Sequence, residues 1–141
     1  MFKEDLKFGH VYERRALDFF KFENFEFNDT GAYDILLDKR IKIEVKADRL
    51  AYATGNLAVE YECRDKPSGI SISEAHYYIF FVIHRNAEDD VYIIPTEHLK
   101  RMVQGCKIAY GGDRNASSIY LLPIKECEKY KYTPELLSGI I

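Results

Sequence analysis

Two strand-like runs joined by a short charged turn constrain this chain more than any other feature. The run from Ile41 to Ala47 alternates strictly between apolar and charged residues, the period of a β-strand with one face in a core. The run from Tyr33 to Leu37 precedes it, and only Asp38-Lys39-Arg40 separates the two. So short a connection makes the two runs neighbouring strands.

The remaining elements predict an α/β (α+β) fold. A stripe of Leu6, Glu13, Leu17 and Phe20 predicts a helix over about the first 23 residues. The later elements are expected, in chain order, as a strand at Leu57–Cys63, a short helical turn near Ser73, a buried strand at Tyr77–His84, a strand at Val91–Ile94, a helix from Pro95 to about Gly105, a strand at Ser118–Leu122 and an irregular helix from Pro123. This order indicates a central mixed sheet flanked by helices, with Leu57–Cys63 beside the strand that contains Glu44.

Size and composition limit the class of protein. With 141 residues, 11 Tyr and 9 Phe, the chain is expected to form one domain, residues 1–141, with a substantial core. The longest apolar run, Tyr77–Ile83, is too short for a membrane span, and the N-terminus has no signal-peptide pattern. Cys63, Cys106 and Cys127 have no metal-ligand spacing and are expected to be free thiols, so a cytoplasmic location is expected.

Charge is unevenly distributed along the chain. The formal net charge is −3, which argues against a simple basic nucleic-acid binder. The stretch from Lys39 to Arg49 nevertheless contains five basic and two acidic residues. Such a local strip suits either a phosphate-facing site or a solvated strand face.

Four residues form a pattern with chemical meaning. Glu44 and Lys46 leave the same face of one strand, and Asp34 lies on the preceding strand, so the two carboxylates can converge. Oxygen ligands suit a hard divalent cation, Mg²⁺ first and Mn²⁺ as a substitute. Glu13 adds a third carboxylate from the apolar stripe of the first helix. Each residue also has an ordinary structural explanation: a solvated strand face for Glu44 and Lys46, a turn for Asp34, and pairing with a neighbouring arginine for Glu13.

The order of these residues resembles the PD-(D/E)XK nuclease superfamily, especially its small, phage-type members that resemble Holliday-junction resolvases. The matching stretches are GHVYERRALDFF and GAYDILLDKRIKIEVKADR, although Tyr33 occupies the place of the motif's proline. The stretch NLAVEYECRDKPSGISISEAHYY is similar to phage-borne relatives, but less specifically. The resemblance implies a restriction-endonuclease-like core with αβββαβ order.

The resemblance also implies roles for individual residues. Asp34, Glu44 and the carbonyl of Val45 would hold Mg²⁺ against a scissile phosphate, and Lys46 would position the attacking water, whose pKa the metal lowers. Glu13 would hold a second ion directly or through water. The expected products have a 5′-phosphate and a 3′-hydroxyl.

Further residues are expected near this site. Glu60 is a possible additional site residue, because its strand is expected to adjoin Glu44, and His10 lies one helical turn before Glu13. Residues that could contact DNA phosphates flank the same region: Arg49, Arg64, Lys66, Ser68 and Ser71.

The leading hypothesis is a Mg²⁺-dependent DNA endonuclease that acts as a homodimer, without membrane association. Branched DNA such as a Holliday junction is the first choice of substrate, and a restriction-type or nicking enzyme is the second. The alternative is a catalytically inactive nucleic-acid-binding or protein-interaction domain with the same fold.

Overall fold

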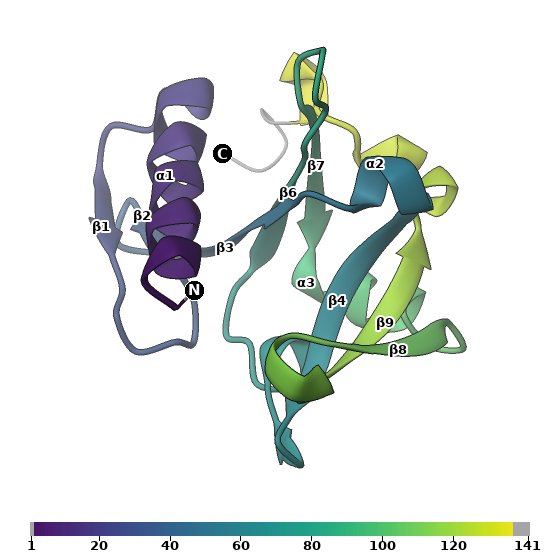
Figure 1. Ribbon diagram of the computed structural model, residues 1–141. Helices are drawn as coiled ribbons and strands as arrows, with labels where there is room; N and C mark the ends of the chain where they lie inside the picture. The colour runs from purple at the N-terminus through teal and green to yellow at the C-terminus, as the bar shows by residue number, and fades with distance from the viewer. Residues whose placement is uncertain (1, 137–141) are drawn as a thin grey trace.

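The fold is mixed α and β, with two β-sheets (Figure 1). The computed structural model describes the backbone of residues 2–136 and the side chains of residues 10–136 except Asp113. The helices and strands span, in chain order, α1 Phe2–Phe20, β1 Phe25–Phe27, β2 Ile35–Leu37, β3 Ile41–Asp48, α2 Ala51–Thr54, β4 Asn56–Cys63, β5 Lys66–Pro67, η1 Gly69–Ser71, β6 Tyr77–Val82, β7 Asp90–Pro95, α3 Thr96–Met102, β8 Lys107–Gly111, η2 Asp113–Asn115, β9 Ser117–Pro123 and η3 Ile124–Tyr130.

The larger sheet has the strand order β1-β2-β3-β6-β7 and is mixed. β1, β2 and β3 pair antiparallel, β3 and β6 run parallel, and β7 returns antiparallel to β6. The second sheet has the order β5-β4-β9-β8 and is antiparallel throughout. The single parallel pair places the carboxyl ends of β3 and β6 side by side.

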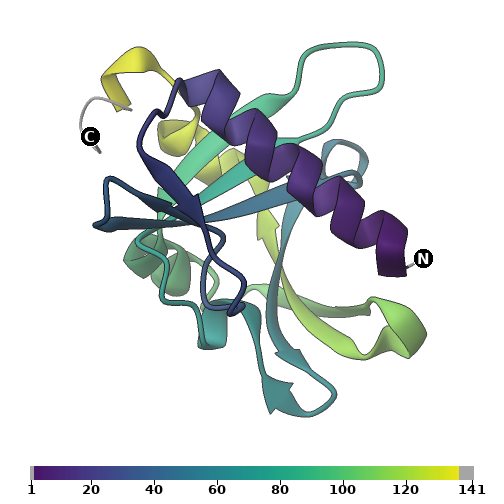
Figure 2. The ribbon, with the colours of Figure 1, turned by 90° about the vertical axis from the view of Figure 1, so that its left-hand side faces the viewer.

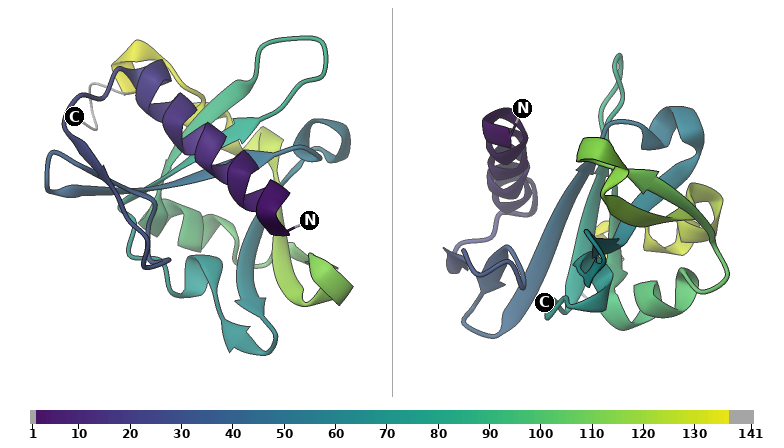
Figure 3. Two further views of the ribbon diagram at one scale, coloured as in Figure 1. Left: turned by 60° about the vertical axis from the view of Figure 1, so that its left-hand side comes forward. Right: turned by 60° about the horizontal axis from the view of Figure 1, so that its bottom comes forward.

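Both faces of the larger sheet are covered. α1 lies diagonally across one face (Figures 1 and 2), where its buried Ala16 and Leu17 join one apolar cluster with Val45 of β3 and Phe81 of β6. The second sheet covers the other face (Figure 3), where Leu57 of β4 packs in a second cluster. That cluster includes Tyr78, Phe80 and Val82 of β6. Because β6 is covered on both sides, its sequence is continuously apolar, as expected.

Several predicted elements are confirmed. The N-terminal helix exists, with Leu17 and Phe20 of its stripe buried, while the side chain of Leu6 lies outside the described residues. The hairpin is in register, with Ile35 opposite Ile43 and Leu37 opposite Ile41. The strand before the turn begins at Ile35, two residues later than expected, because the chain leaves the sheet at Asp34.

One predicted neighbour is wrong. Residues 57–63 form a strand, but β4 pairs with β9 in the second sheet, and β6 occupies the place beside β3. The chain turns away after β3 through α2 and Gly55, whose φ of 76° is left-handed. The three strands that follow α1 are therefore β1, β2 and β3. β1, β5 and β8 were not expected, because each has at most five residues, too few for a periodic pattern to stand out from a loop.

Two further expectations concern whole-chain properties. The three cysteines are free thiols, and only Cys127 is buried. Within residues 2–136, no helix combines the length and apolar character needed to cross a bilayer.

Candidate active site

Asp34 is anchored at the point where β2 leaves the sheet. Its N–H donates to the carbonyl of Ile43 at 2.9 Å, and the register of β2 on β3 puts it opposite Glu44. Its Oδ2 accepts a hydrogen bond from the N–H of Val45 at 2.7 Å. The carboxylate thus replaces the backbone acceptor that β2 no longer supplies to β3. As a result, the Asp34 carboxylate is held against β3 beside Glu44.

Glu44 and Lys46 form an ion pair on β3. Lys46 Nζ lies 3.1 Å from Glu44 Oε2, and the side chains are 46% and 13% exposed, respectively. Their alternation on the strand puts both on the face opposite the buried Ile43 and Val45. The lysine therefore reaches solvent at the mouth of the site while its position is fixed by a largely buried carboxylate.

Glu13 approaches the same acids from α1. Its side chain is 14% exposed, and its Oε2 lies 3.6 Å from Nδ1 of His10, itself 69% exposed. The buried neighbours Tyr12 and Ala16 fix this part of the helix on the sheet. The charges of Asp34 and Glu44 act on Glu13, so the first helix contributes to this acidic cluster.

Burial dominates the proton affinity of the three acids. It raises the pKa of Glu13 to about 7, with a further contribution from the charge of Asp34. Burial likewise raises the pKa of Asp34, against the hydrogen bond from Val45, and the pKa of Glu44, against the charge of Lys46. For Lys46, burial favours the neutral amine, but the carboxylates of Glu44 and Asp34 outweigh it and raise the pKa. The site concentrates negative charge that a cation would neutralise.

Two carboxylates, rather than three, are available as direct metal ligands. Among the described side chains, no group of three or more His, Cys, Asp or Glu residues is close enough to hold a metal ion. Mg²⁺ is commonly held by one or two carboxylates together with substrate phosphates. Asp34 and Glu44 fit that requirement in number and donor type, and a bound cation would offset the burial that raises the pKa of both carboxyls. Glu13 does not complete a three-residue ligand group in this arrangement.

Tyr78 belongs to the site, although its sequence context indicates only core. It lies directly across from Glu44 in the parallel β3–β6 register and is 2% exposed. Its hydroxyl is hydrogen-bonded to Ser73, and burial raises its pKa, with smaller effects from Glu44, Lys46 and Asp34. A buried tyrosine needs a hydrogen-bond partner for its hydroxyl. Within the apolar run, that requirement was the only sequence signal that Tyr78 lies near polar groups.

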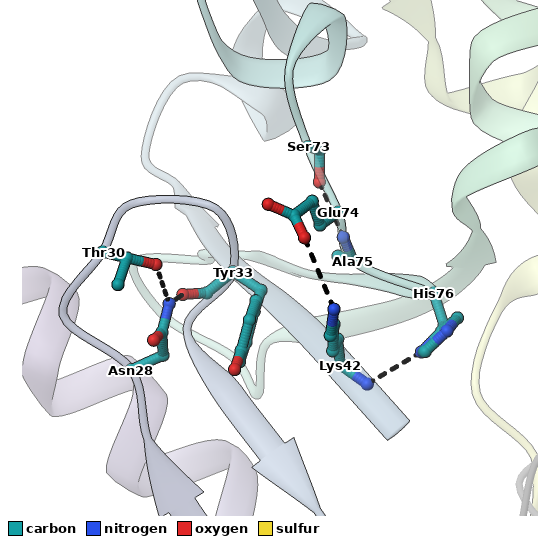
Figure 4. Close-up of polar contacts among 8 residues, drawn as sticks. All are labelled: Asn28, Thr30, Tyr33, Lys42, Ser73, Glu74, Ala75 and His76. Atoms are coloured by element: carbon teal, nitrogen blue, oxygen red, sulfur yellow. Dashed lines mark hydrogen bonds and ion pairs between the residues drawn. The ribbon is translucent and has the colours of Figure 1, made fainter. Parts of the chain in front are cut away.

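Polar contacts fix the loop that leads into Asp34 (Figure 4). Asn28 Nδ2 donates to Thr30 Oγ1 at 2.6 Å and to the carbonyl of Tyr33 at 3.0 Å. Lys42 connects this region to the segment before β6, since its Nζ lies 3.4 Å from Glu74 Oε1 and its N–H donates to Nδ1 of His76 at 2.9 Å. These contacts tie the approach to Asp34 to the approach to Tyr78.

The structure brings Glu60 to a different partner from the one expected. Glu60 Oε2 accepts a hydrogen bond from Ser68 Oγ at 2.9 Å, and Ser71 Oγ donates to the carbonyl of Tyr61 at 2.7 Å. Both serines thus fasten η1 to β4, and the strand of Glu60 does not pair with the strand of Glu44, because β4 belongs to the second sheet.

The three predicted phosphate-binding bases lie at two separate places. Arg64 and Lys66 are exposed at the β4–β5 hairpin, where Arg64 has a left-handed φ of 51°. Arg49 is exposed and follows the last residue of β3. Only Arg49 therefore continues the strand that contains Glu44 and Lys46.

The chain matches no protein-family model, and comparison with curated proteins gives no significant match.

Proposed function

We propose that this protein is a metal-dependent endonuclease that hydrolyses phosphodiester bonds in DNA. The observation that carries the proposal is the convergence of Asp34, Glu44 and Lys46, where β2 leaves the sheet beside β3. The two largely buried carboxylates can ligate a cation, and the lysine beside them, which reaches solvent, supplies a positively charged hydrogen-bond donor. The remaining acidic charge explains why an added cation would be needed before a phosphate could approach.

The strand arrangement supports a restriction-endonuclease-like core. Three antiparallel strands follow an N-terminal helix, and β6 then joins the third strand in parallel. A helix covers one face, and the acids lie at the junction of the second and third strands. These features support the restriction-endonuclease-like core that the resemblance to the PD-(D/E)XK superfamily implies, although β1 comes between the helix and the strand that leads from Asp34.

Each residue of the site has a proposed part in the reaction. Mg²⁺, or Mn²⁺ in its place, would be held by Asp34 and Glu44 and would stabilise the negative charge that builds up on the phosphate. Glu44 orients the amine of Lys46, and Lys46 positions the attacking water by hydrogen bonding. The Val45 N–H keeps the carboxylate of Asp34 in place. The products would have a 5′-phosphate and a 3′-hydroxyl.

A second candidate function is a non-catalytic nucleic-acid-binding or protein-interaction domain. Two observations favour it: no three-residue metal group among the described side chains, and a Glu44 that is already neutralised by Lys46. In that case Lys46 would serve only to offset a buried carboxylate. Cleavage experiments separate the two candidates directly.

The test is cleavage of labelled four-way-junction, linear duplex and single-stranded DNA in Mg²⁺ or Mn²⁺, with Lys46→Ala alongside. Removal of a preorganised donor is expected to slow cleavage roughly 100- to 1,000-fold. Lys100→Ala is the matched control, because Lys100 is 42% exposed and pairs with Glu97 at 3.5 Å. If no DNA is cut and calorimetry detects no metal binding, the endonuclease proposal fails.

Branched DNA and a homodimer complete the proposal. A 16.5 kDa chain offers little surface to embrace a junction, and a symmetric four-way junction presents two equivalent strands for cleavage. Sedimentation of Lys46→Ala with an intact four-way junction is expected to give two protein chains per junction. A single chain per junction would contradict this part of the proposal.

A further inference from the structure

A pocket lies at the carboxyl ends of the parallel strands β3 and β6. Its volume is about 410 Å³, and its lining includes Arg49, Tyr52, Ala53, His84, Arg85 and Asn86. α2 and the β6–β7 connection form its walls, both at the upper end of Figure 1. The volume falls within the roughly 300–1,000 Å³ that is typical of small-molecule sites. Ligands often bind at the carboxyl ends of parallel strands.

The pocket presents an exposed aromatic ring on a fixed support. Tyr52 is 66% exposed, yet its ring centroid lies 4.2 Å from the ring of His84. His84 is held in turn by Asp90, whose Oδ2 lies 2.8 Å from its Nε2. Aromatic side chains that are held in place but open to solvent are the platforms on which unpaired bases stack.

The charge around this ring favours an anion. Arg49 and Arg85 both line the pocket. Of the acids in the neighbouring turn, Asp89 lies 3.0 Å from Arg15, Asp90 pairs with Lys131 and with His84 of the pocket lining, and Glu88 is exposed. Guanidinium groups bind phosphate through paired hydrogen bonds. The aromatic ring can stack on the base of a nucleotide, and the two arginines beside it can bind the phosphate.

The pocket is fixed relative to the acidic site by Asp48. This residue shares the strand face of Glu44 and Lys46, and its Oδ1 accepts hydrogen bonds from the N–H groups of Leu50 at 3.0 Å and Ala51 at 2.9 Å. Asp48 thereby caps α2, which carries Tyr52. Arg49 follows Lys46 by three residues, about 10 Å along an extended strand.

We propose that this pocket binds one nucleotide of a nucleic-acid strand that extends from the acidic site. The base stacks on Tyr52, and the adjoining phosphate contacts Arg49 and Arg85. This inference rests on the proposed endonuclease function and narrows its substrate. Because a stacked base must be unpaired, the preferred substrate has a single-stranded segment at this pocket.

The test measures binding without cleavage. Lys46→Ala protein is titrated into a fluorescein-labelled single-stranded 12-mer and a blunt duplex in EDTA, with and without Tyr52→Ala. Loss of one stacking platform is expected to weaken single-strand binding roughly fivefold to 100-fold. Tyr52→Phe is expected to keep the affinity. Tyr110→Ala is the matched control, because Tyr110 is also 66% exposed, and it is expected to change nothing.

A second variant tests the phosphate contact. Arg85→Gln is expected to weaken binding of the single-stranded 12-mer and to reduce the salt dependence of that binding by about one counterion. Arg101→Gln is the control, because Arg101 of α3 is also exposed. A separate titration uses deoxyadenosine monophosphate in place of the 12-mer, with Tyr52→Ala and with Tyr52-intact protein. It shows whether the pocket binds a free nucleotide or a nucleotide within a strand.

The outcomes separate the two proposals. If Tyr52→Ala weakens single-strand binding but no DNA is cleaved by the Lys46-intact chain, the nucleotide pocket stands and the endonuclease proposal fails. If DNA is cleaved but Tyr52→Ala binds the 12-mer with unchanged affinity, the pocket is wrong and the endonuclease stands. If Tyr52→Ala weakens binding of the monophosphate but not binding of the 12-mer, the assignment of the pocket to a strand is wrong.

Discussion

The three acids of the candidate site differ in what compensates their charge. Asp34 accepts a backbone hydrogen bond from Val45, and Glu44 has Lys46 at 3.1 Å. Glu13 has the largely exposed His10 at 3.6 Å, together with a weaker effect of the Lys46 charge. The pKa of Glu13 consequently rises to about 7, mainly through burial. Ionisation of Glu13 near neutral pH is therefore expected to destabilise the folded state.

Glu13→Gln is expected to change how stability depends on pH. Because the pKa of Glu13 is raised on folding, its contribution is fully present below about 4.5 and is lost as the pH rises to about 7. Between these limits, the stability of the Gln variant relative to wild type should increase by about 3 kcal/mol, at 1.36 kcal/mol per pKa unit. Urea unfolding in EDTA at pH 4.5 and pH 8 measures the difference.

The control for this prediction is Glu97→Gln, since Glu97 is 76% exposed. An equal pH-dependent gain in Glu97→Gln would show that the effect does not depend on the burial of Glu13. A difference between Glu13→Gln and wild type that does not vary with pH would contradict the assigned pKa.

At the scale of elements, the loop between β4 and β6 depends on one close backbone approach. Gly69 begins η1 with a left-handed φ of +50°, and a Cβ on it would overlap the carbonyl of Glu60. The register of β4 on β9 shifts between Glu60 and Glu62, so the β4 backbone is irregular at this contact. The buried Ile70 then packs with the core of the second sheet. Gly69 thus lets the loop lie directly on β4.

Gly69→Ala is expected to destabilise the protein more than Gly105→Ala does. Gly105 also has a left-handed φ, +80°, but a Cβ there meets nothing within 4 Å. Its substitution should cost about 1–2 kcal/mol for backbone strain alone. The Gly69 variant carries the same strain and a backbone overlap as well. Urea denaturation of both variants measures the gap, and equal losses would show that the overlap relaxes without cost.

At the scale of the whole molecule, β6 connects the two apolar clusters. Its Ile79 and Phe81 pack under α1, whereas Tyr78, Phe80 and Val82 pack against the second sheet. Successive residues of one strand therefore belong to different layers. Loss of either layer exposes one face of the same strand, so the two layers should unfold together.

Leu57→Ala tests this coupling from the second sheet. Leu57 is fully buried, and its truncation is expected to cost about 2–5 kcal/mol. The far-ultraviolet helical signal, dominated by the distant α1, should be lost at the same lowered urea concentration as tyrosine fluorescence. Leu50→Ala is the control, because Leu50 is 70% exposed and its removal should change stability by under about 0.5 kcal/mol. Two separate transitions would disprove the coupling.

The sequence by itself determined the parts of this protein whose contacts are local. The first helix followed from its apolar spacing, and the β2–β3 hairpin followed from a short turn between two extended runs. The same hairpin brings Asp34 opposite Glu44, and strict alternation puts Lys46 on the face of Glu44. These features depend on residues within about a dozen positions of one another, so the pattern alone specifies them.

Only the tertiary structure decided which strands meet across long separations. β6 rather than β4 lies beside β3, and that choice puts Tyr78, not Glu60, in the strand position next to Glu44. It also creates the pocket whose lining includes Tyr52 and His84. A strand's period shows which of its faces is apolar but not which partner covers that face. That choice depends on how both sheets and α1 bury their apolar faces together.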